Sequence, residues 1–251
     1  ITGRVIIVPA FNFPAFMAGK RVSPIDGRNL NRTFPGKPDG TVTEKIADYF
    51  ATQLVPLAHL VVDFHSGGKT LDFVPFACSH VLEDKEQERL CAEAVEAFNA
   101  PYTMRLLEID NVGMYDTEVE NHGKVFVTTE LGGGGTASAN SARIAKRGVR
   151  NVLKHAGIMK GEIERQPSTF LDMPDHECFV FSEVRGLIEP LVDLGEAVEQ
   201  GQPIARIWPT EKTGDAPVEY MSHKTGVLIS RHFPGLVQPG DCLGVVGVHI
   251  D

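Results

Sequence analysis

The chain has 251 residues, and its 24 basic and 33 acidic side chains give a formal net charge of −9. We expect no nucleic-acid partner, because a surface that follows phosphates usually carries a basic balance. With 42% apolar and 23% charged residues, the composition is typical of a globular protein. The longest apolar runs are much shorter than the about 18 residues that cross a bilayer, so we expect no membrane partner.

The cysteines and the first residues indicate the cellular compartment of the protein. Four scattered cysteines without a C-x-x-C pair indicate reduced thiols, so we expect a cytoplasmic protein. The segment from Ile1 lacks the basic start and the cleavage site of a signal peptide. It opens on an apolar run without an initiator Met, from which we expect that an N-terminal part is missing.

The region 1–160 alternates apolar runs with helical patterns, which predicts an α/β fold with a mixed, mostly parallel sheet and flanking helices. We expect the first two strands to be buried, because their apolar runs are nearly continuous. The expected strands cover residues 4–10, 59–65, 74–78 and 124–131, and the expected helices cover 43–57, 84–99 and 139–155.

The region 161–251 loses helical periodicity and predicts a small all-β domain. Its stretches 186–195 and 226–235 resemble each other, and each is followed by a Val-x-x-Gly turn. Two related halves of this kind are similar to the barrel-sandwich architecture of biotinyl and lipoyl carrier domains. Lys212 and Lys224 are candidate attachment points, but neither has the flanking residues of those domains, so we expect ordinary solvated lysines.

A Pro- and Gly-rich loop over residues 21–36 concentrates polar side chains, with Arg21, Arg28 and Arg32 beside two asparagines. Guanidinium groups bind carboxylates in a bidentate fashion, and Asn adds a neutral donor and acceptor. The loop therefore predicts an anionic substrate. A solvated turn with surface arginines is the alternative, and composition alone slightly favours it.

Two apolar strands end in a chemically reactive side chain followed by small residues. His65 follows one of them, in the place where open α/β sheets carry catalytic groups or metal ligands. Asp63 points to the same face of that strand and is a candidate partner for the ring. Glu130 ends the other strand before Gly132–Gly135, and a partly desolvated carboxylate there suits a general base. A structural role is the alternative for each.

Three motifs follow one another along the chain, in the order Asn-Arg-x-Phe-Pro-Gly, Asp-Phe-His-Ser-Gly and Thr-x-Glu-Leu-Gly. The ordered set resembles the succinylglutamate desuccinylase and aspartoacylase family, over nearly the whole chain. The resemblance implies a zinc carboxypeptidase-like catalytic region followed by a β domain. It also implies a Zn²⁺-dependent amidohydrolase whose partner is a small-molecule N-acyl amino acid.

The resemblance assigns roles to the catalytic candidates. His65 matches a zinc ligand, and Glu130 matches the general base. Arg21 best matches the arginine that polarises the scissile carbonyl, with Arg28 as the competitor. The family's other two zinc ligands lie in a His-x-x-Glu motif, which we expect upstream of Ile1.

The resemblance also assigns substrate contacts. Asn31 and Arg32 match the pair that holds the substrate carboxylate, and Tyr115 matches a substrate-contacting tyrosine ahead of the Glu strand. The His-x-x-Glu of His80 and Glu83 follows the wrong strand, so we interpret it as coincidence.

Two other classes of function stay open at this point. One is a non-catalytic ligand-binding or carrier-like protein with an incomplete metal site. The other is a metal-free hydrolase with a serine nucleophile at Ser23 or Ser66, although neither lies in Gly-x-Ser-x-Gly. The acyl group, the amino acid and the oligomeric state, a homo-oligomer included, also stay open.

Overall fold

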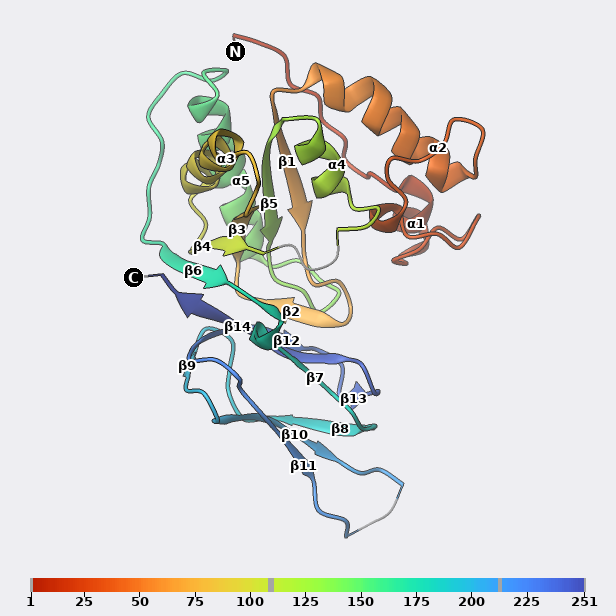
Figure 1. The fold of residues 1–251 in the computed structure, drawn as a ribbon, viewed down its shortest axis with the longest axis vertical. Helices are drawn as coiled ribbons and strands as arrows, with labels where there is room; N and C mark the ends of the chain where they lie inside the picture. The colour runs from red at the N-terminus through yellow and green to blue at the C-terminus, as the bar shows by residue number, and fades with distance from the viewer. Residues whose placement is uncertain (1, 108–110, 212–213, 251) are drawn as a thin grey trace.

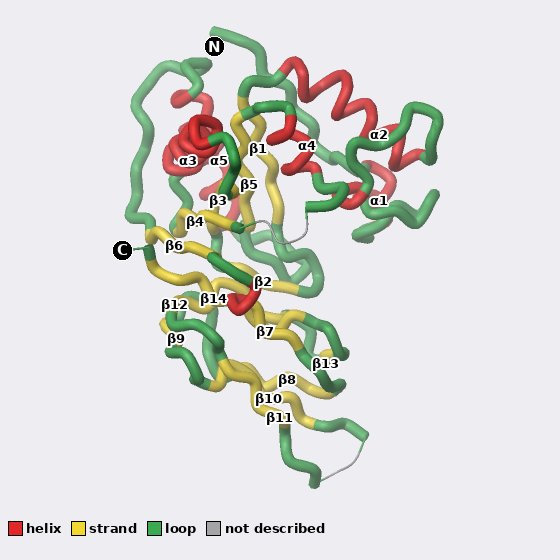
Figure 2. The backbone as a smooth tube through the Cα atoms, viewed as in Figure 1, coloured by secondary structure: helices red, strands yellow, loops and turns green. Residues whose placement is uncertain are grey.

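The computed structural model describes residues 2–107, 111–211 and 214–250, and Figures 1 and 2 show its layout. The α-helices are α1 (Phe13–Ala18), α2 (Val42–Tyr49), α3 (Lys85–Phe98), α4 (Tyr115–Asn121) and α5 (Ala139–His155). Shorter helical turns are η1 (Leu30–Arg32), η2 (Phe50–Leu54), η3 (Val55–Leu57) and η4 (His176–Cys178).

The strands of the first part are β1 (Leu60–His65), β2 (Leu71–Phe73), β3 (Phe76–His80), β4 (Tyr102–Leu106) and β5 (Val125–Glu130). They are followed by β6 (Thr169–Met173), β7 (Phe179–Phe181), β8 (Gly186–Pro190), β9 (Ala197–Val198) and β10 (Pro203–Trp208). The last are β11 (Val218–Met221), β12 (Gly226–His232), β13 (Leu236–Val237) and β14 (Cys242–His249).

Within the described residues, the larger sheet has the order β1-β5-β3-β4-β6-β14-β12-β2, with β7 beside β14 and β9 beside β12. The pairs β1/β5, β3/β4 and β4/β6 are parallel, and β3/β5 is antiparallel. The fold is therefore mixed α/β, as predicted.

Strand β5 lies between two helical layers. The side chain of Phe126 packs into an apolar cluster with residues of α2 and α4, and that of Val127 packs into another with residues of α3 and α5. Successive residues of a strand point to opposite faces, so β5 is covered on both sides. Figure 1 shows α3 and α5 on one side of β1 and β5, with α2 and α4 on the other.

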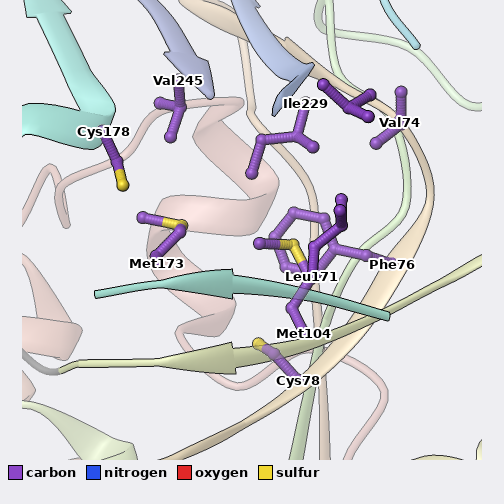
Figure 3. Packing of buried hydrophobic residues seen from close by; sticks show 10 residues of the cluster. Val74, Phe76, Cys78, Met104, Leu171, Met173, Cys178, Ile229 and Val245 are labelled. Atoms are coloured by element: carbon purple, nitrogen blue, oxygen red, sulfur yellow. The ribbon is translucent and has the colours of Figure 1, made fainter. Parts of the chain in front are cut away.

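The sheet continues across residue 160, where the expected domain division falls. Strand β6 pairs with β4 on one side and with β14 on the other, and β12 pairs with β2. One apolar cluster spans these strands and includes Phe76, Met104, Leu171 and Ile229 (Figure 3). The two parts of the chain therefore share a sheet and a core.

The two similar stretches of the C-terminal region have the same order of strands, long-short-long, in β8-β9-β10 and in β12-β13-β14. The short strand of each half pairs with the first strand of the other half, because β9 pairs with β12 and β13 with β8. The expected Val-x-x-Gly turns carry Gly201 and Gly240 at φ +82 and +89°, a conformation that glycine adopts without strain.

The predicted helices are confirmed where capping residues mark their ends. Asp84 accepts hydrogen bonds from the first turn of α3, and Asn99 ends that helix at φ +59°. Ser138 forms a capping box with Ser141 at the start of α5, and Gly157 follows its end at φ +70°. The predicted helix 43–57 is divided among α2, η2 and η3.

The prediction of a buried strand over residues 4–10 is wrong. This segment forms no strand with the described chain, and Val5, Ile6, Ile7 and Val8 are exposed, Ile7 to 79%. An apolar run becomes a buried strand only where a neighbour supplies hydrogen bonds and cover, and the segment has neither here. The strand expected over residues 59–65 is present as β1, but it is not fully buried as expected. It lies at the edge of the sheet and is half-buried, with Phe64 exposed to 45%.

Among the described helices, none combines the length and the apolar character needed to cross a bilayer.

Candidate active site

His65 and Glu130 lie side by side at the carboxyl ends of two parallel strands. They are paired residues in the last rung of the β1/β5 ladder, and Leu131 N–H donates to the His65 carbonyl at 3.0 Å. Ligand sites of open α/β sheets lie at such strand ends. The structure therefore brings together the residue predicted as a metal ligand and the residue predicted as the general base.

The loops that follow these strands are joined by backbone hydrogen bonds. Gly67 N–H donates to the Gly132 carbonyl at 2.9 Å, and Gly134 N–H donates to the Leu71 carbonyl at 3.0 Å. A Cβ atom at Gly133 would overlap the Leu71 carbonyl oxygen. The glycine run thus permits close backbone packing, which fixes both strand ends.

The imidazole of His65 is held by Asp63, whose Oδ2 lies 2.7 Å from Nε2. The two side chains share one face of β1, as predicted, and that of His65 is 39% exposed. Burial alone lowers the pKa of His65. The hydrogen bond and the charge of Asp63 outweigh burial and, with the charge of Glu130, raise that pKa to about 9.

Glu130 carries a desolvated carboxyl group. Its Oε2 atom is buried and has no hydrogen-bond partner in the described part of the chain. Burial raises the pKa of Glu130 to about 7, and the charge of Asp63 adds to the rise. The charges of His65 and Arg21 oppose it. The carboxyl can therefore accept or release a proton near neutral pH.

A cavity of about 260 Å³ opens beside His65, and Glu130, the residue paired with His65, is not among its lining residues. Arg21, Asn31, His65 and Tyr115, all predicted as site residues, line it together with Asp63. Its other lining residues are Phe11, Asn12, Ala15, Phe16, Lys20, Asn29, Leu30, Phe34 and Phe64. Donor groups and aromatic rings thus surround a space that suits a small anionic ligand.

Loop 21–36 is fastened to the start of α2. Thr43 donates from its backbone N–H and from its hydroxyl to the Asp26 carboxylate, both at 2.8 Å. The guanidinium of Arg28 lies 3.5 Å from a carboxylate oxygen of Glu44, and Arg28 does not line the cavity. Arg21 therefore lines the cavity, whereas Arg28 pairs with α2.

The second half of this loop contacts α4. Asn31 Oδ1 accepts the backbone N–H of Tyr115 at 2.7 Å, and Phe34 N–H donates to the Gly113 carbonyl. The Tyr115 ring is buried in an aromatic cluster with Phe34, where burial and then the Asp63 charge raise the pKa of its hydroxyl.

Arg32 follows Asn31 but lies outside the cavity lining. Its guanidinium donates to the Asn31 carbonyl at 2.6 Å, and its side chain is exposed. Arg32 is thus near the cavity without lining it.

Two further asparagines line the cavity, and sequence reasoning missed Asn12 while it counted Asn29 only as a polar residue of loop 21–36. Asn12 caps α1 by accepting Ala15 N–H, and its Nδ2 atom is buried without a partner in the described chain. Asn29 caps η1 by accepting Asn31 N–H. The signal for Asn12 was an Asn two residues before Pro14 within a short apolar stretch, a pattern typical of a helix start.

The described residues contain no group of three His, Cys, Asp or Glu side chains that could hold a metal ion. His80, the first residue of the His-x-x-Glu coincidence, is buried and lies 2.9 Å from Glu120. His80 is therefore engaged away from the cavity.

The structure argues against Lys224 as an attachment point. Lys224 forms ion pairs of 2.9 Å with Asp175 and with Glu177, which raise its pKa. A lysine held in this way is unsuited to carry a swinging group, and Lys212 lies outside the described residues.

Comparison with known proteins identifies a family and close relatives in sequence and in fold. The model of the succinylglutamate desuccinylase/aspartoacylase catalytic domain matches residues 1–156. The N-alpha-acetyl-L-2,4-diaminobutyric acid deacetylase of Halomonas elongata is 53% identical over 248 residues, which cover 98% of this chain and 72% of that protein.

Solved structures are similar over the same length. The product-bound ectoine utilization protein EutE (DoeB) of Ruegeria pomeroyi is 64% identical, with a TM-score of 0.97 over 98% of this chain and 75% of that one. A succinylglutamate desuccinylase of Silicibacter sp. is 61% identical, with a TM-score of 0.93 over 97% of this chain and 74% of that one. Fold, site and similarity together define a hydrolase of the deacylase class. The chain belongs to the succinylglutamate desuccinylase/aspartoacylase family.

Proposed function

We propose that this protein hydrolyses the amide bond of an N-acyl amino acid in a zinc-dependent reaction. The observation that carries the proposal is the pair of strand ends, where the buried carboxyl of Glu130, with a pKa of about 7, lies beside His65. Arg21 and Asn31 line the adjoining cavity and supply the donors that an anionic substrate requires.

The residues present fit one ligand of a catalytic zinc ion. Because Asp63 holds Nε2 of His65, Nδ1 is the nitrogen that is left to coordinate a metal. A carboxylate behind a ligand histidine is the usual arrangement, since it fixes the ring and increases its basicity. Zinc, when bound, would supply Lewis acidity at the scissile carbonyl.

Glu130 moves the proton in the proposed mechanism. As a carboxylate it accepts a proton from the attacking water molecule, and it then transfers this proton to the nitrogen of the leaving amine. A pKa near neutrality suits both transfers, because the group must gain and lose the proton in one cycle.

The arginines and Asn31 bind the negative charges of the substrate and of the reaction. Arg21 acts electrostatically on Glu130 and lines the cavity, so its guanidinium is placed to stabilise the oxyanion that develops during attack. Asn31 and Arg32 hold the substrate carboxylate, Asn31 from the cavity wall and Arg32 from beside it. Tyr115 contacts the substrate from the aromatic side of the cavity.

We propose N-alpha-acetyl-L-2,4-diaminobutyrate as the substrate, in the degradation of ectoine. Similarity to the Halomonas elongata deacetylase over 98% of the chain supports this choice, as does similarity to the ectoine utilization protein. The products are acetate and a free diamino acid. We also propose a cytoplasmic location, with which the thiols of Cys91, Cys178 and Cys242 agree.

The C-terminal strands form, in this proposal, a barrel-sandwich-like unit after the catalytic region. The four-stranded sheet β11-β10-β8-β13 and the β12/β14 pair enclose a common apolar cluster that includes Ile207, Leu228 and Val246. The reciprocal pairing of the two halves supports the comparison with carrier domains.

An assay across N-acyl amino acids tests the function. Release of free amine from N-alpha-acetyl-L-2,4-diaminobutyrate is measured together with zinc content. We expect hydrolysis of this compound to exceed that of N-succinyl and N-acetyl-aspartate analogues, with activity proportional to bound zinc. A zinc-loaded protein that hydrolyses none of these amides would contradict the proposal.

A further inference from the structure

Phe233, the residue that follows β12, lies outside the apolar cores of the molecule. Its side chain belongs to none of the apolar clusters of the described residues, and Phe233 is 48% exposed. Nor is it among the residues that line the cavity. A role for this ring therefore has to come from a contact other than core packing or the cavity wall.

The ring of Phe233 lies directly against the backbone of Gly134. A Cβ atom on Gly134 would come within 2.6 to 2.9 Å of three atoms of the ring. Carbon atoms in contact are normally about 3.5–4.0 Å apart, so a side chain at this position would overlap the ring. The contact is therefore possible only because residue 134 is a glycine.

Backbone pairing holds this ring in place. The Phe233 N–H donates to the Thr70 carbonyl at 2.8 Å, and His232 is paired with Leu71 where β12 lies beside β2 (Figure 1). The Leu71 carbonyl in turn accepts the Gly134 N–H at 3.0 Å. Strand β2 thus joins the C-terminal region to the glycine run, residues Gly132–Gly135.

The glycine run continues directly from the strand that carries Glu130. The Oε2 atom of Glu130 is buried and has no hydrogen-bond partner in the described chain, so the position of this carboxyl depends on the backbone at the end of β5. The run is also bound to the loop after His65, because Gly67 N–H donates to the Gly132 carbonyl. A shift of the run would therefore be transmitted to both strand ends.

We propose that Phe233 is a positioning residue for Glu130, which it holds by covering Gly134 and clamping the glycine run against β2. The C-terminal region then contributes to the reaction without contacting the substrate. The catalytic part of this inference rests on the proposed function. The clamp itself does not, because it is a property of the protein without substrate.

Two variants and a control separate the ring from general effects of substitution. Phe233→Ala removes the cover over Gly134, whereas Phe233→Leu keeps an apolar side chain there. The matched control is Phe181→Ala, which removes an exposed ring from β7 of the same region, where the ring stacks on that of Phe179.

The first readout is hydrogen exchange in the zinc-loaded protein without substrate. In Phe233→Ala we expect the amides of Gly134 and Gly67 to exchange about tenfold faster, and that of Val127 in the core of β5 to stay within about twofold. In Phe181→Ala all three should stay within about twofold. Unchanged exchange at Gly134 in Phe233→Ala would overturn the clamp, and so would equal acceleration at Val127, which would indicate a general loss of stability.

The second readout is the kcat and KM for N-alpha-acetyl-L-2,4-diaminobutyrate. Phe233→Ala should lower kcat by about tenfold and change KM by no more than about twofold, because the base is displaced while the substrate contacts are kept. Phe233→Leu should restore kcat to within about threefold of the unsubstituted protein. A raised KM with unchanged kcat in Phe233→Ala would overturn the positioning role, and so would an equal fall of kcat in Phe181→Ala.

Gly134→Ala tests the same contact from the other side and does not depend on the folding of Phe233→Ala. Its Cβ would displace the ring, so kcat should fall, and the fall should be at least about threefold smaller when Gly134→Ala is combined with Phe233→Leu. An equal fall in both backgrounds would overturn the contact. If the unsubstituted protein hydrolyses no acyl amino acid, the proposed function fails, while the exchange experiment still decides whether Phe233 clamps the glycine run.

Discussion

His65 and Glu130 are directly paired across the last rung of two parallel strands, although 64 residues separate them in the sequence. The ladder sets the spacing of their backbones, and the hydrogen-bonded glycine loops beyond it keep both strand ends in place. A candidate metal ligand and a candidate base are thus held by the sheet itself, which is more rigid than a loop would be.

The charge of Asp63 should raise the pKa of His65. Asp63→Asn keeps the shape of the side chain but removes the charge that raises the pKa of the ring. We expect the pKa of His65 in the metal-free protein to fall by at least about one unit, measured by NMR titration. Activity of the zinc-loaded variant should fall by about 10- to 100-fold. An unchanged pKa of His65 in Asp63→Asn would show that Asp63 does not raise this pKa.

The arginines of loop 21–36 should differ in their kinetic effects. Arg21→Ala should mainly lower kcat, because it removes charge stabilisation that develops in the transition state. Arg32→Ala should mainly raise KM, because a carboxylate contact is made equally in the ground state. Arg28→Ala is the comparison, since Arg28 pairs with Glu44, and it should change neither constant by more than about twofold. A drop in kcat for Arg28→Ala equal to that for Arg21→Ala would contradict this assignment of roles.

Asp26 should make stability depend on acidic pH. Partial burial alone raises the pKa of Asp26, but hydrogen bonds from Thr43 outweigh it and hold that pKa below its usual range. A lowered pKa stabilises the folded state at pH values above the unfolded-state pKa of Asp, which is about 3.9. This contribution is lost as the pH falls from that value towards the lower pKa of the folded state.

Asp26→Asn should therefore lower the free energy of unfolding by about 1 kcal/mol at pH 7, as for other carboxylates at helix starts. Urea unfolding at several pH values measures this difference. The gap between the two proteins should narrow below about pH 4. A gap that stays constant down to pH 3 would contradict the assignment.

Gly133 should be intolerant of a side chain. Gly133→Ala places a Cβ against the Leu71 carbonyl, which is backbone and cannot move aside, so we expect a loss of about 1–3 kcal/mol in the free energy of unfolding and reduced activity. Gly235→Ala is the control, because its Cβ meets nothing within 4 Å. Equal stability of the two variants, measured by denaturant unfolding, would contradict the close packing of the loops.

Local signals in the sequence were sufficient for much of the fold. Apolar residues at helical spacing predicted the helices α3 and α5, and the strands before His65 and Glu130 could be recognised by their apolar runs. The residues 4–10 were misjudged because an apolar run does not reveal whether a neighbouring strand will pair with it.

The site was harder to predict from the sequence than the fold. The ion pair of Arg28 with Glu44 is a contact with another element, and the sequence did not reveal that Arg21 lines the cavity while Arg28 does not. That Asn12 reaches the cavity depends on how α1 packs. The pairing of β2 with β12, which joins the two regions, is a long-range contact without a local signal.

The central claim is that Glu130 is the base, and Glu130→Gln tests it most directly. The change is nearly isosteric, so fold and zinc content should be retained, while turnover of N-alpha-acetyl-L-2,4-diaminobutyrate should fall by about 10²-fold or more because the proton acceptor is gone. Zinc content and turnover are measured on the same preparation. A zinc-loaded Glu130→Gln protein with normal turnover would contradict the mechanism.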